Sequence, residues 1–222
     1  MKQIHIIHHP RRIFLKSTAL GLAACAFPGG INRVLAASSG GGKTLVVYFS
    51  WPETLTAHNM TEEEENSTVV INGKVLGNTQ YVAMVIAEAT GAELFRIEPL
   101  KPYPMEHKPL IAQAKNEQRR NYRPVMAKPL ENLQRYDTIF LGYPNWWADL
   151  PMILYTFLEQ HDLSGKTVIP FSTHGGSGFS GTIHTIADLQ PKATVVRDGY
   201  TVDRDVVAEA APQVIDWVKQ VA

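Results

Sequence analysis

The sequence of 222 residues has a single cysteine, Cys25, no excess of either charge and no long hydrophobic run. One cysteine excludes an intramolecular disulfide framework and any metal site built from several thiolates. The 21 Lys and Arg residues balance 21 Asp and Glu residues, but the first 37 residues hold five of the basic and none of the acidic ones. The remaining part therefore has 16 basic against 21 acidic residues. Because phosphate backbones are bound by clustered basic side chains, no nucleic-acid partner is expected.

The first 37 residues have the composition of an export signal. Arg11 and Arg12 precede Ile-Phe-Leu-Lys and a weakly apolar run at residues 17–27. That run is about half the length needed to cross a bilayer, so we expect a cleaved signal and no transmembrane segment in the mature protein. The arginine pair resembles the twin-arginine export signal, which implies a periplasmic or other extracytoplasmic location. Small residues place cleavage near Ala37 or Ser38, and residues 38–42 then form a linker.

Two alternatives for this segment stay open at the level of sequence. The run Leu-Ala-Ala-Cys that ends at Cys25 fits the lipobox pattern, which would make the protein a lipoprotein anchored through that cysteine. The segment could also be a buried N-terminal helix with a chance arginine pair. The Pro-Gly-Gly sequence at residues 28–30 and the glycines at 40–42 argue against the helix, because they isolate the segment from the rest of the chain.

From residue 43 onward, short apolar runs alternate with helical periodicity. Runs rich in β-branched and aromatic residues are typical of strands buried on both faces, and they span residues 43–49, 93–98, 138–143, 167–172 and 193–196. Helical spacing of apolar residues appears at 81–90, 105–120, 150–158, 182–189 and 206–221, with a kink expected at Pro212. This alternation predicts an α/β fold, a doubly wound, five-stranded parallel sheet with helices on both faces. Ligands of such sheets bind beyond the carboxyl ends of the strands.

The loop after the first strand contains an insertion of about residues 54–76. Within it, Asn72 and Gly73 stand between β-branched residues, which is the strongest short-range signal for a β-hairpin. The acidic run from Glu62 to Glu65 is typical of a solvated loop, with a docking patch for a basic partner as the alternative. We therefore predict an inserted hairpin that returns the chain to the first helix.

Without this insertion, Ser50 and Trp51 would lead directly into Gly77, Asn78 and Thr79 and then into a helix. A turn rich in hydroxyls and glycine before a helix N-terminus offers N–H groups and the positive end of the helix dipole to a phosphate. The turn contains no Lys or Arg, which favours a monophosphate over a triphosphate. The alternative is that these residues only cap the helix.

The loops after the third and fourth strands add two further features. Tyr143, Trp146 and Trp147 cannot all be buried in the core, so they offer planar apolar faces at a strand end. The glycine-rich residues 173–179 allow the backbone to approach a ligand closely. His174 in this loop is either a proton donor or a residue that acts through its backbone. A phosphate turn, an aromatic platform and a glycine-rich loop together predict a pocket for flavin mononucleotide, FMN.

From residue 43 to the end, the chain resembles the flavodoxin family. The matching stretches are residues 46–51 continued at 77–79, then 142–147, then 172–178. The resemblance implies strand order 2-1-3-4-5 and FMN bound non-covalently. It implies that four residues surround the phosphate: Ser50, Trp51, Asn78 and Thr79. It implies that nine residues line the ring: Pro144, Asn145, Trp146, Trp147, Thr173, His174, Gly175, Gly176 and Gly178. The insertion puts in doubt whether Pro52 and Glu53 reach the phosphate.

The function expected from this resemblance is electron transfer by an exported FMN protein, with a redox protein or a small molecule as partner. The alternative is an FMN-dependent NAD(P)H:quinone-type oxidoreductase. No catalytic side chain is predicted. No metal site is predicted either, because His161 and His184 lack metal-ligand spacing with any cluster of Cys, Asp or Glu. A Gly-x-Gly-x-x-Gly pattern at 176–181 with Asp198 resembles a dinucleotide fingerprint, but it follows the fourth strand rather than the first.

Overall fold

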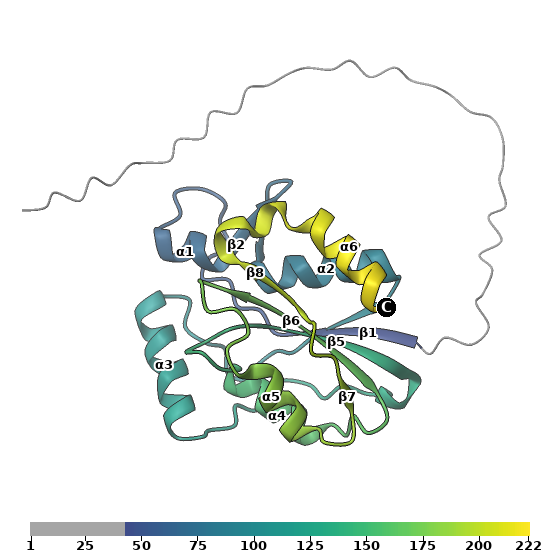
Figure 1. The fold of residues 1–222 in the computed structure, drawn as a ribbon. Helices are drawn as coiled ribbons and strands as arrows, with labels where there is room; N and C mark the ends of the chain where they lie inside the picture. The colour runs from purple at the N-terminus through teal and green to yellow at the C-terminus, as the bar shows by residue number, and fades with distance from the viewer. Residues whose placement is uncertain (1–42) are drawn as a thin grey trace, which may run out of the picture. The chain divides into compact units, whose positions relative to one another are not determined.

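The computed structural model describes residues 43–222 (Figure 1), and the predictions for residues 1–42 lie outside this range. Its sheet contains the five predicted parallel strands, observed as β1 (Lys43–Tyr48), β4 (Glu93–Arg96), β5 (Tyr136–Pro144), β6 (Thr167–His174) and β7 (Thr194–Val195). They lie in the order β4-β1-β5-β6-β7. Numbered along the chain, this is the predicted order 2-1-3-4-5. The α/β fold class is therefore confirmed.

A sixth strand, β8 (Tyr200–Asp203), departs from the prediction of five strands. The long strand β6 pairs with β7 at its beginning, where Thr167 faces Thr194, and with β8 at its end, where His174 faces Asp203. The outer edge of the sheet is thus made of two short strands in succession. As a consequence, the residues after β8 reach the carboxyl end of β6.

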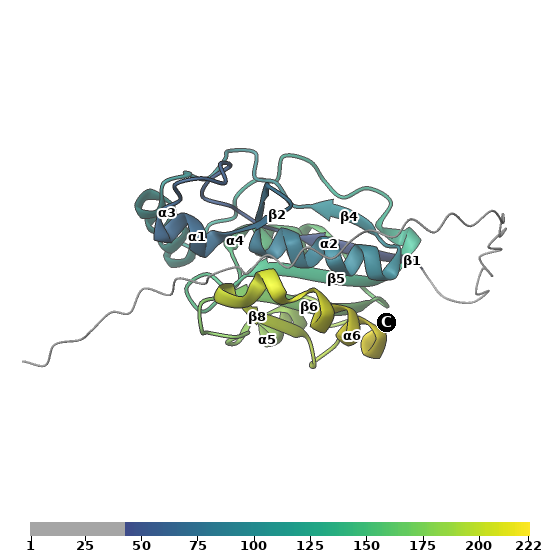
Figure 2. The same cartoon turned by 90° about the horizontal axis from the view of Figure 1, so that it is seen from above.

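Helices cover both faces of the sheet, as Figure 2 shows from above. One face carries α2 (Asn78–Thr90) and α6 (Ala211–Val221), and the other carries α3 (His107–Arg119), α4 (Met152–Gln160) and α5 (Thr182–Leu189). Successive side chains of a strand point to opposite faces of the sheet. Val46 and Tyr48 are therefore buried on the face covered by α2 and α6, and the other face buries Leu45, Val47 and Phe49. Because both faces of β1 are covered, its sequence is a nearly continuous apolar run.

The C-terminal segment corrects the prediction of one helix kinked at Pro212. It forms a 3₁₀ helix, η2 (Arg204–Glu209), followed by α6, which begins at Ala211 with Pro212 in its first turn. Proline is tolerated there because the first N–H groups of a helix have no intrahelical partner. Pro109 likewise lies in the first turn of its helix, α3. A short 3₁₀ helix, η1 (Leu133–Arg135), precedes β5.

The insertion forms α1 (Glu62–Ser67) and a two-stranded sheet of β2 (Thr68–Ile71) and β3 (Lys74–Gly77). The predicted hairpin is confirmed, because Asn72 and Gly73 form its turn with φ of 51° and 76°. The prediction of a loop for the acidic run was wrong. Thr61 and Glu64 form a reciprocal capping box that starts a helix there, and four acidic side chains in the first turn suit its positive end.

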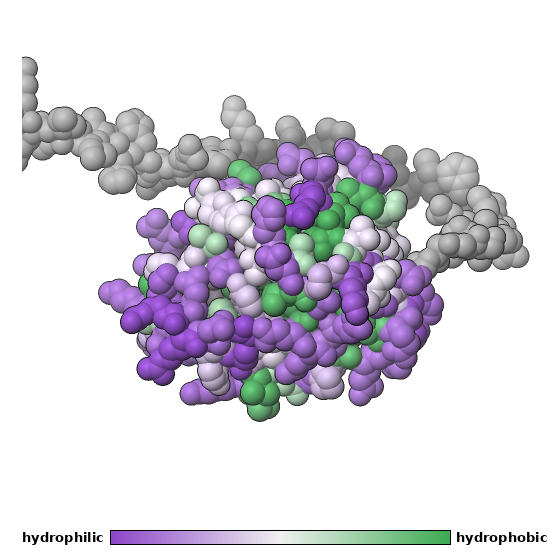
Figure 3. Space-filling view, turned by 60° about the horizontal axis from the view of Figure 1, so that its bottom comes forward, coloured by the Kyte–Doolittle hydropathy of each residue, from purple (hydrophilic) through white to green (hydrophobic). Residues whose placement is uncertain are grey.

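The insertion lies at one end of the sheet (Figures 1 and 2), and the face of the domain drawn in Figure 3 is mostly polar. In both ribbon views, α1 and α3 lie at the carboxyl ends of the parallel strands (Figures 1 and 2). In the face drawn in Figure 3, polar side chains predominate and hydrophobic ones gather in smaller groups among them. Among residues 43–222, none of the helices has both the length and the apolar composition that a membrane crossing requires.

Candidate functional site

A cleft opens beyond the carboxyl ends of β1, β5 and β6, between the N-terminus of α2 and one side of α3. Of the thirteen predicted site residues, eleven line it: Ser50, Trp51, Asn78, Thr79, Pro144, Asn145, Trp146, Trp147, Thr173, His174 and Gly175. Gly176 and Gly178 belong to the turn after them and are not part of the walls. Tyr143 does not share the aromatic face, because it is fully buried and its hydroxyl lies 2.8 Å from that of Thr182.

The polar end of the cleft lies at the N-terminus of α2. Thr79, in the first turn of α2, and Thr173, near the end of β6, join their hydroxyl groups at 2.8 Å, and both side chains are buried. Ser50 is also buried, and its carbonyl oxygen accepts a hydrogen bond from Arg96 Nη2 at 3.1 Å. The first N–H groups of α2 have no intrahelical acceptor. This end therefore presents hydroxyl and N–H donors together with a positive helix end, which suits an anion.

Asn78 begins α2 and is the buried amide of this polar end. Its Nδ2 donates to the carbonyl oxygen of Asn66 at 2.9 Å, which ties the end of α1 to α2. Its Oδ1 is buried and has no hydrogen-bond partner among the residues that the structure describes. A buried acceptor without a partner costs free energy, so this oxygen is available to a donor from a bound molecule.

Aromatic side chains form another part of the wall. The ring of Trp146 meets Phe49 edge to face at 5.4 Å and Tyr103 at 5.5 Å. Trp51 packs on the same Tyr103 at 5.7 Å, and its Nε1 donates to the carbonyl oxygen of Pro104 at 3.0 Å. These edge-to-face contacts stabilise the orientation of each ring. Trp51 and Trp146 are thus held as fixed flat surfaces in the cleft.

Trp147 stands at the tip of a tight turn. Trp146 and Asp149 exchange two backbone hydrogen bonds of 3.1 Å, and Trp147 and Ala148 between them have φ of 55° and 60°. This is a two-residue hairpin turn in the left-handed region, and since neither central residue is glycine the turn stores strain. Trp147 Nε1 donates to the carbonyl oxygen of Ile111 in α3 at 3.3 Å. The ring remains 48% exposed and accessible at the cleft.

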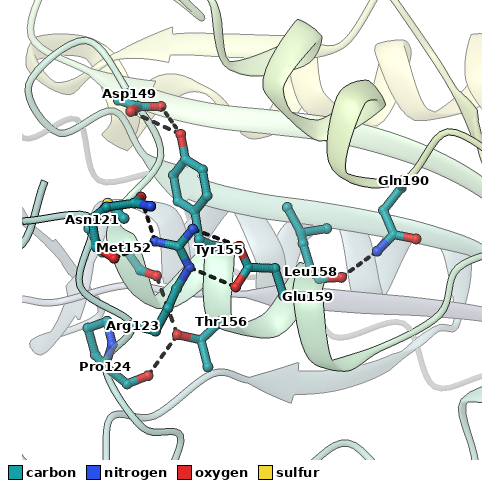
Figure 4. Close-up of polar contacts among 10 residues, drawn as sticks. All are labelled: Asn121, Arg123, Pro124, Asp149, Met152, Tyr155, Thr156, Leu158, Glu159 and Gln190. Atoms are coloured by element: carbon teal, nitrogen blue, oxygen red, sulfur yellow. Dashed lines mark hydrogen bonds and ion pairs between the residues drawn. The ribbon is translucent and has the colours of Figure 1, made fainter.

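A polar network behind this turn fixes Asp149 (Figure 4). The hydroxyl of Tyr155 in α4 contacts both carboxylate oxygens of Asp149, at 2.9 and 3.0 Å. Arg123 packs over the Tyr155 ring at 4.8 Å and forms a two-pronged pair with Glu159 at 2.6 and 2.7 Å. Burial and the hydrogen bond to Asp149 raise the pKa of Tyr155 to about 12, so the hydroxyl keeps its proton. The network anchors the strained turn that presents Trp147.

The loop after β6 is anchored to the loop after β5. The backbone N–H of Asn145 donates to the carbonyl oxygen of Thr173 at 2.8 Å, and its Nδ2 donates to the carbonyl oxygen of Gly178 at 2.7 Å. Gly176 and Gly178 both have positive φ, and the Gly176 N–H donates to His174 Nδ1 at 3.0 Å. The glycines therefore turn the loop back, while His174 and the residues before it face the cleft. Asn145 Oδ1 is buried without a partner among residues 43–222.

Two residues that sequence reasoning did not select form a pair at the cleft. Glu53, just before the insertion, is buried, and its Oε2 lies 2.9 Å from Nδ1 of His107, the first residue of α3. Burial raises the pKa of Glu53, and the hydrogen bond and charge of His107 offset part of this effect. Nothing in the sequence signals the pair, because 54 residues separate its members. The insertion had put the places of Pro52 and Glu53 in doubt. Glu53 lines the cleft, and Pro52 does not.

The remaining walls come from segments without a recognisable motif. Asn66 and Ser67 end α1, and an apolar side of α3 adds Leu110, Ile111 and Ala114. Arg204, the first residue of η2, completes the cleft. The helical spacing of Leu110, Ile111 and Ala114 is a signal that could have placed them on one face. Arg204 follows the strand that the sequence pattern did not reveal.

The arrangement as a whole can hold a molecule that has both an anionic group and a flat ring. Hydroxyls and helix N–H groups gather at one part of the cleft and tryptophan rings at another. Within residues 43–222, no group of three or more His, Cys, Asp or Glu side chains is arranged to hold a metal ion.

Several solved structures resemble this chain. A candidate flavoprotein from Bacteroides uniformis is 30% identical, with a TM-score of 0.58 over 81% of this chain and 99% of that one. A candidate flavoprotein from Bacteroides eggerthii is 28% identical, with a TM-score of 0.57 over 79% and 99% of the two chains. A flavoprotein from Lactobacillus acidophilus, solved in complex with FMN, is 18% identical, with a TM-score of 0.53 over 76% and 98%, which shows a common fold alone.

No protein with curated functional information matches the sequence at a significant level. The family model of the flavodoxins matches residues 67–221, which is well over half of the chain. The matched region contains α2, the loops after β5 and β6, and both strands of the outer edge. The chain therefore belongs to the flavodoxin family.

Proposed function

We propose that this protein binds FMN non-covalently in the cleft and transfers electrons outside the cytoplasm. The observation that carries the proposal is the convergence of three loops on one cleft, with hydroxyls at the α2 N-terminus and tryptophans after β5. The FMN complex of the Lactobacillus acidophilus flavoprotein, which has the same fold, supports this choice of ligand. Bound FMN would supply reversible uptake of electrons.

The residues of the polar end fit the tail of FMN. The hydroxyls of Ser50 and Thr79 and the first N–H groups of α2 are donors that suit a phosphate. Asn78 Oδ1 is an acceptor, so it suits a hydroxyl of the ribityl chain rather than the phosphate. Both kinds of partner that the tail requires are therefore present.

The residues of the aromatic part fit the ring. Trp146 and Trp147 offer apolar surfaces to a planar ring system, and the contacts behind them keep them in place. Asn145 Oδ1 is a second buried acceptor without a partner in residues 43–222, and it suits the ring N–H of oxidised flavin. The protein would thus orient the ring and exclude water from part of it.

A fluorescence titration tests the binding. Full-length protein is added to FMN, and we expect quenching that saturates at one protein per flavin. Trp147→Leu should weaken the affinity about 3- to 10-fold, because ring stacking contributes about 0.5–1.5 kcal/mol beyond area burial. Trp217→Phe is the matched control, since Trp217 belongs to α6 and packs on Phe140 and Tyr200 outside the cleft. Unquenched FMN fluorescence with folded wild-type protein would refute the proposal.

The reactions of the bound flavin distinguish an electron carrier from an enzyme. Steady-state oxidation of NADH or NADPH with a quinone by the FMN-loaded protein would favour the NAD(P)H:quinone-type oxidoreductase. An electron carrier instead shows no such turnover and is reduced in separate one-electron steps in a potentiometric titration. The redox partner is then a protein or a small acceptor that meets the exposed Trp147 edge.

Export is part of the proposal and is supported by the sequence of residues 1–37. The twin-arginine route carries folded proteins, which suits a cofactor that must be loaded before export. Replacing both Arg11 and Arg12 by Lys should leave the protein in the cytoplasm, as measured by cell fractionation. Cys25→Ala distinguishes the two modes of processing, since it would release a lipoprotein from the membrane fraction and leave a cleaved protein unchanged.

A further inference from the structure

Arg204 brings a positive charge to the cleft from the far end of the chain. It is the first residue of η2 and follows β8, whose pairing with β6 sets His174 opposite Asp203. In the part of the chain that the structure describes, it is the one Lys or Arg among the residues lining the cleft. Its position therefore depends on the sixth strand of the sheet.

The guanidinium group of Arg204 is seated against the backbone of Gly175. A Cβ atom at Gly175 would lie 2.9 Å from Cζ and 3.0 Å from both Nε and Nη1 of Arg204, so a side chain there would displace the group. Gly175 lies two residues after Thr173, whose hydroxyl contacts Thr79 in the first turn of α2. Arg204 thus lies against the loop whose Thr173 contacts the first turn of α2.

The charge of Arg204 is not neutralised by a close acidic partner. Its nearest carboxylate is Asp205, with 4.0 Å between Nε and Oδ1, and both side chains are well exposed. Arg123, by comparison, approaches Glu159 to 2.6 Å in a two-pronged pair. Across residues 43–222, Arg204 makes no other ion pair, so its donors are available to an anion in the cleft.

The other charged side chains of the cleft do not offer a free positive charge to an anionic ligand. Glu53 is an acid, and its partner His107 contacts it at 2.9 Å. His174 Nδ1 accepts a hydrogen bond from Gly176 and lies 3.5 Å from Asp203. An anionic ligand would therefore have Arg204 as its permanently charged partner, because a guanidinium stays protonated and pairs with phosphate through two N–H groups.

We propose that Arg204 binds the phosphate of FMN and so makes the cleft selective for phosphorylated flavin over riboflavin. This inference rests on the proposed function and adds to it a residue that the loop sequences do not contain. The hydroxyls and N–H groups of the polar end would orient the phosphate, and Arg204 would supply the countercharge.

The test compares two ligands that differ only in the phosphate. Dissociation constants for FMN and riboflavin are measured by fluorescence quenching with full-length wild type, Arg204→Gln and Arg204→Lys. Arg204→Gln should weaken FMN binding about tenfold or more, because a hydrogen bond to a charged group is lost, and leave riboflavin within about twofold. Arg204→Lys, which keeps the charge, should lie between the two. Arg135→Gln is the matched control, since Arg135 pairs with Glu93 and does not line the cleft.

Each result bears on one claim. An unchanged preference for FMN in Arg204→Gln would overturn the inference, as would equal losses for FMN and riboflavin, because the latter points to the ring or to the fold. Wild type that binds neither flavin would refute the proposed function instead. If Arg204→Gln does not fold, the wild-type salt dependence decides: added NaCl should weaken FMN binding more than riboflavin binding, and equal sensitivity would contradict the role of Arg204.

Discussion

The buried hydroxyl pair of Thr79 and Thr173 gives the sharpest test of how the cleft is held together. The two oxygens lie 2.8 Å apart, and the residues are 1% and 3% exposed, so water does not replace either partner. Valine has nearly the same shape as threonine and lacks the hydroxyl. Thr79→Val and Thr173→Val therefore each leave one hydroxyl buried without the partner it had.

The expected magnitude follows from this geometry. A single replacement should lower the free energy of unfolding by about 1–3 kcal/mol, the cost of an unsatisfied buried polar group. The double variant replaces both partners by apolar groups of the same shape, which is close to neutral. It should therefore be about 1–3 kcal/mol more stable than the sum of the single losses implies.

Urea denaturation without flavin measures the free energy of unfolding of wild type, both single variants and the double variant. FMN titration of the same four proteins then measures their affinity for the ligand. The double variant should combine near-normal stability with weaker FMN binding, because two of the hydroxyls at the polar end are gone. Additive losses in the cycle would show that the hydroxyls do not depend on each other. Undiminished FMN affinity in the double variant would show that they do not face the ligand.

Two further predictions concern the interior. Gly142→Ala should destabilise the domain by about 1–3 kcal/mol, because a Cβ there would collide with the Phe171 ring between paired strands, and thermal unfolding checks it; an unchanged Tm would contradict this packing. Burial raises the pKa of Glu117, which accepts hydrogen bonds from Tyr103 and Gln113, so its contribution to stability is present at low pH and is lost as pH rises through the raised pKa. Glu117→Gln should therefore gain stability relative to wild type as pH rises above the ordinary pKa of a glutamate, in urea titrations, and a constant difference would refute the assignment.

The elements that local sequence determines were predictable. The turn of the inserted hairpin needs only Asn72 and Gly73, and the strands buried on both faces need only their own apolar runs. The strand β8 could not be predicted in this way. Its four residues alternate weakly, and they pair with the end of β6 because β7 leaves that half of its edge open. The helix α1 depends on a reciprocal cap between Thr61 and Glu64, which the acidic composition concealed.

The candidate site likewise has a part that the sequence predicts and a part that it does not. Loops that directly follow strands had to meet at one edge of the sheet, so Ser50, Asn145 and Thr173 could be placed together from the topology alone. Arg204 reaches the cleft only because the sixth strand pairs with the end of β6, and Glu53 meets His107 only because α3 lies beside the loop after β1. No local pattern encodes either approach. The density of glycine after β6 likewise does not say which glycine faces the cleft.

The most direct measurement is the visible absorption spectrum of the full-length protein, purified gently, mixed with FMN and freed of unbound ligand by gel filtration. We expect a yellow protein that carries close to one flavin per chain, with bands shifted from those of free FMN. A colourless protein that remains folded after this treatment would contradict the assignment of the cleft to FMN.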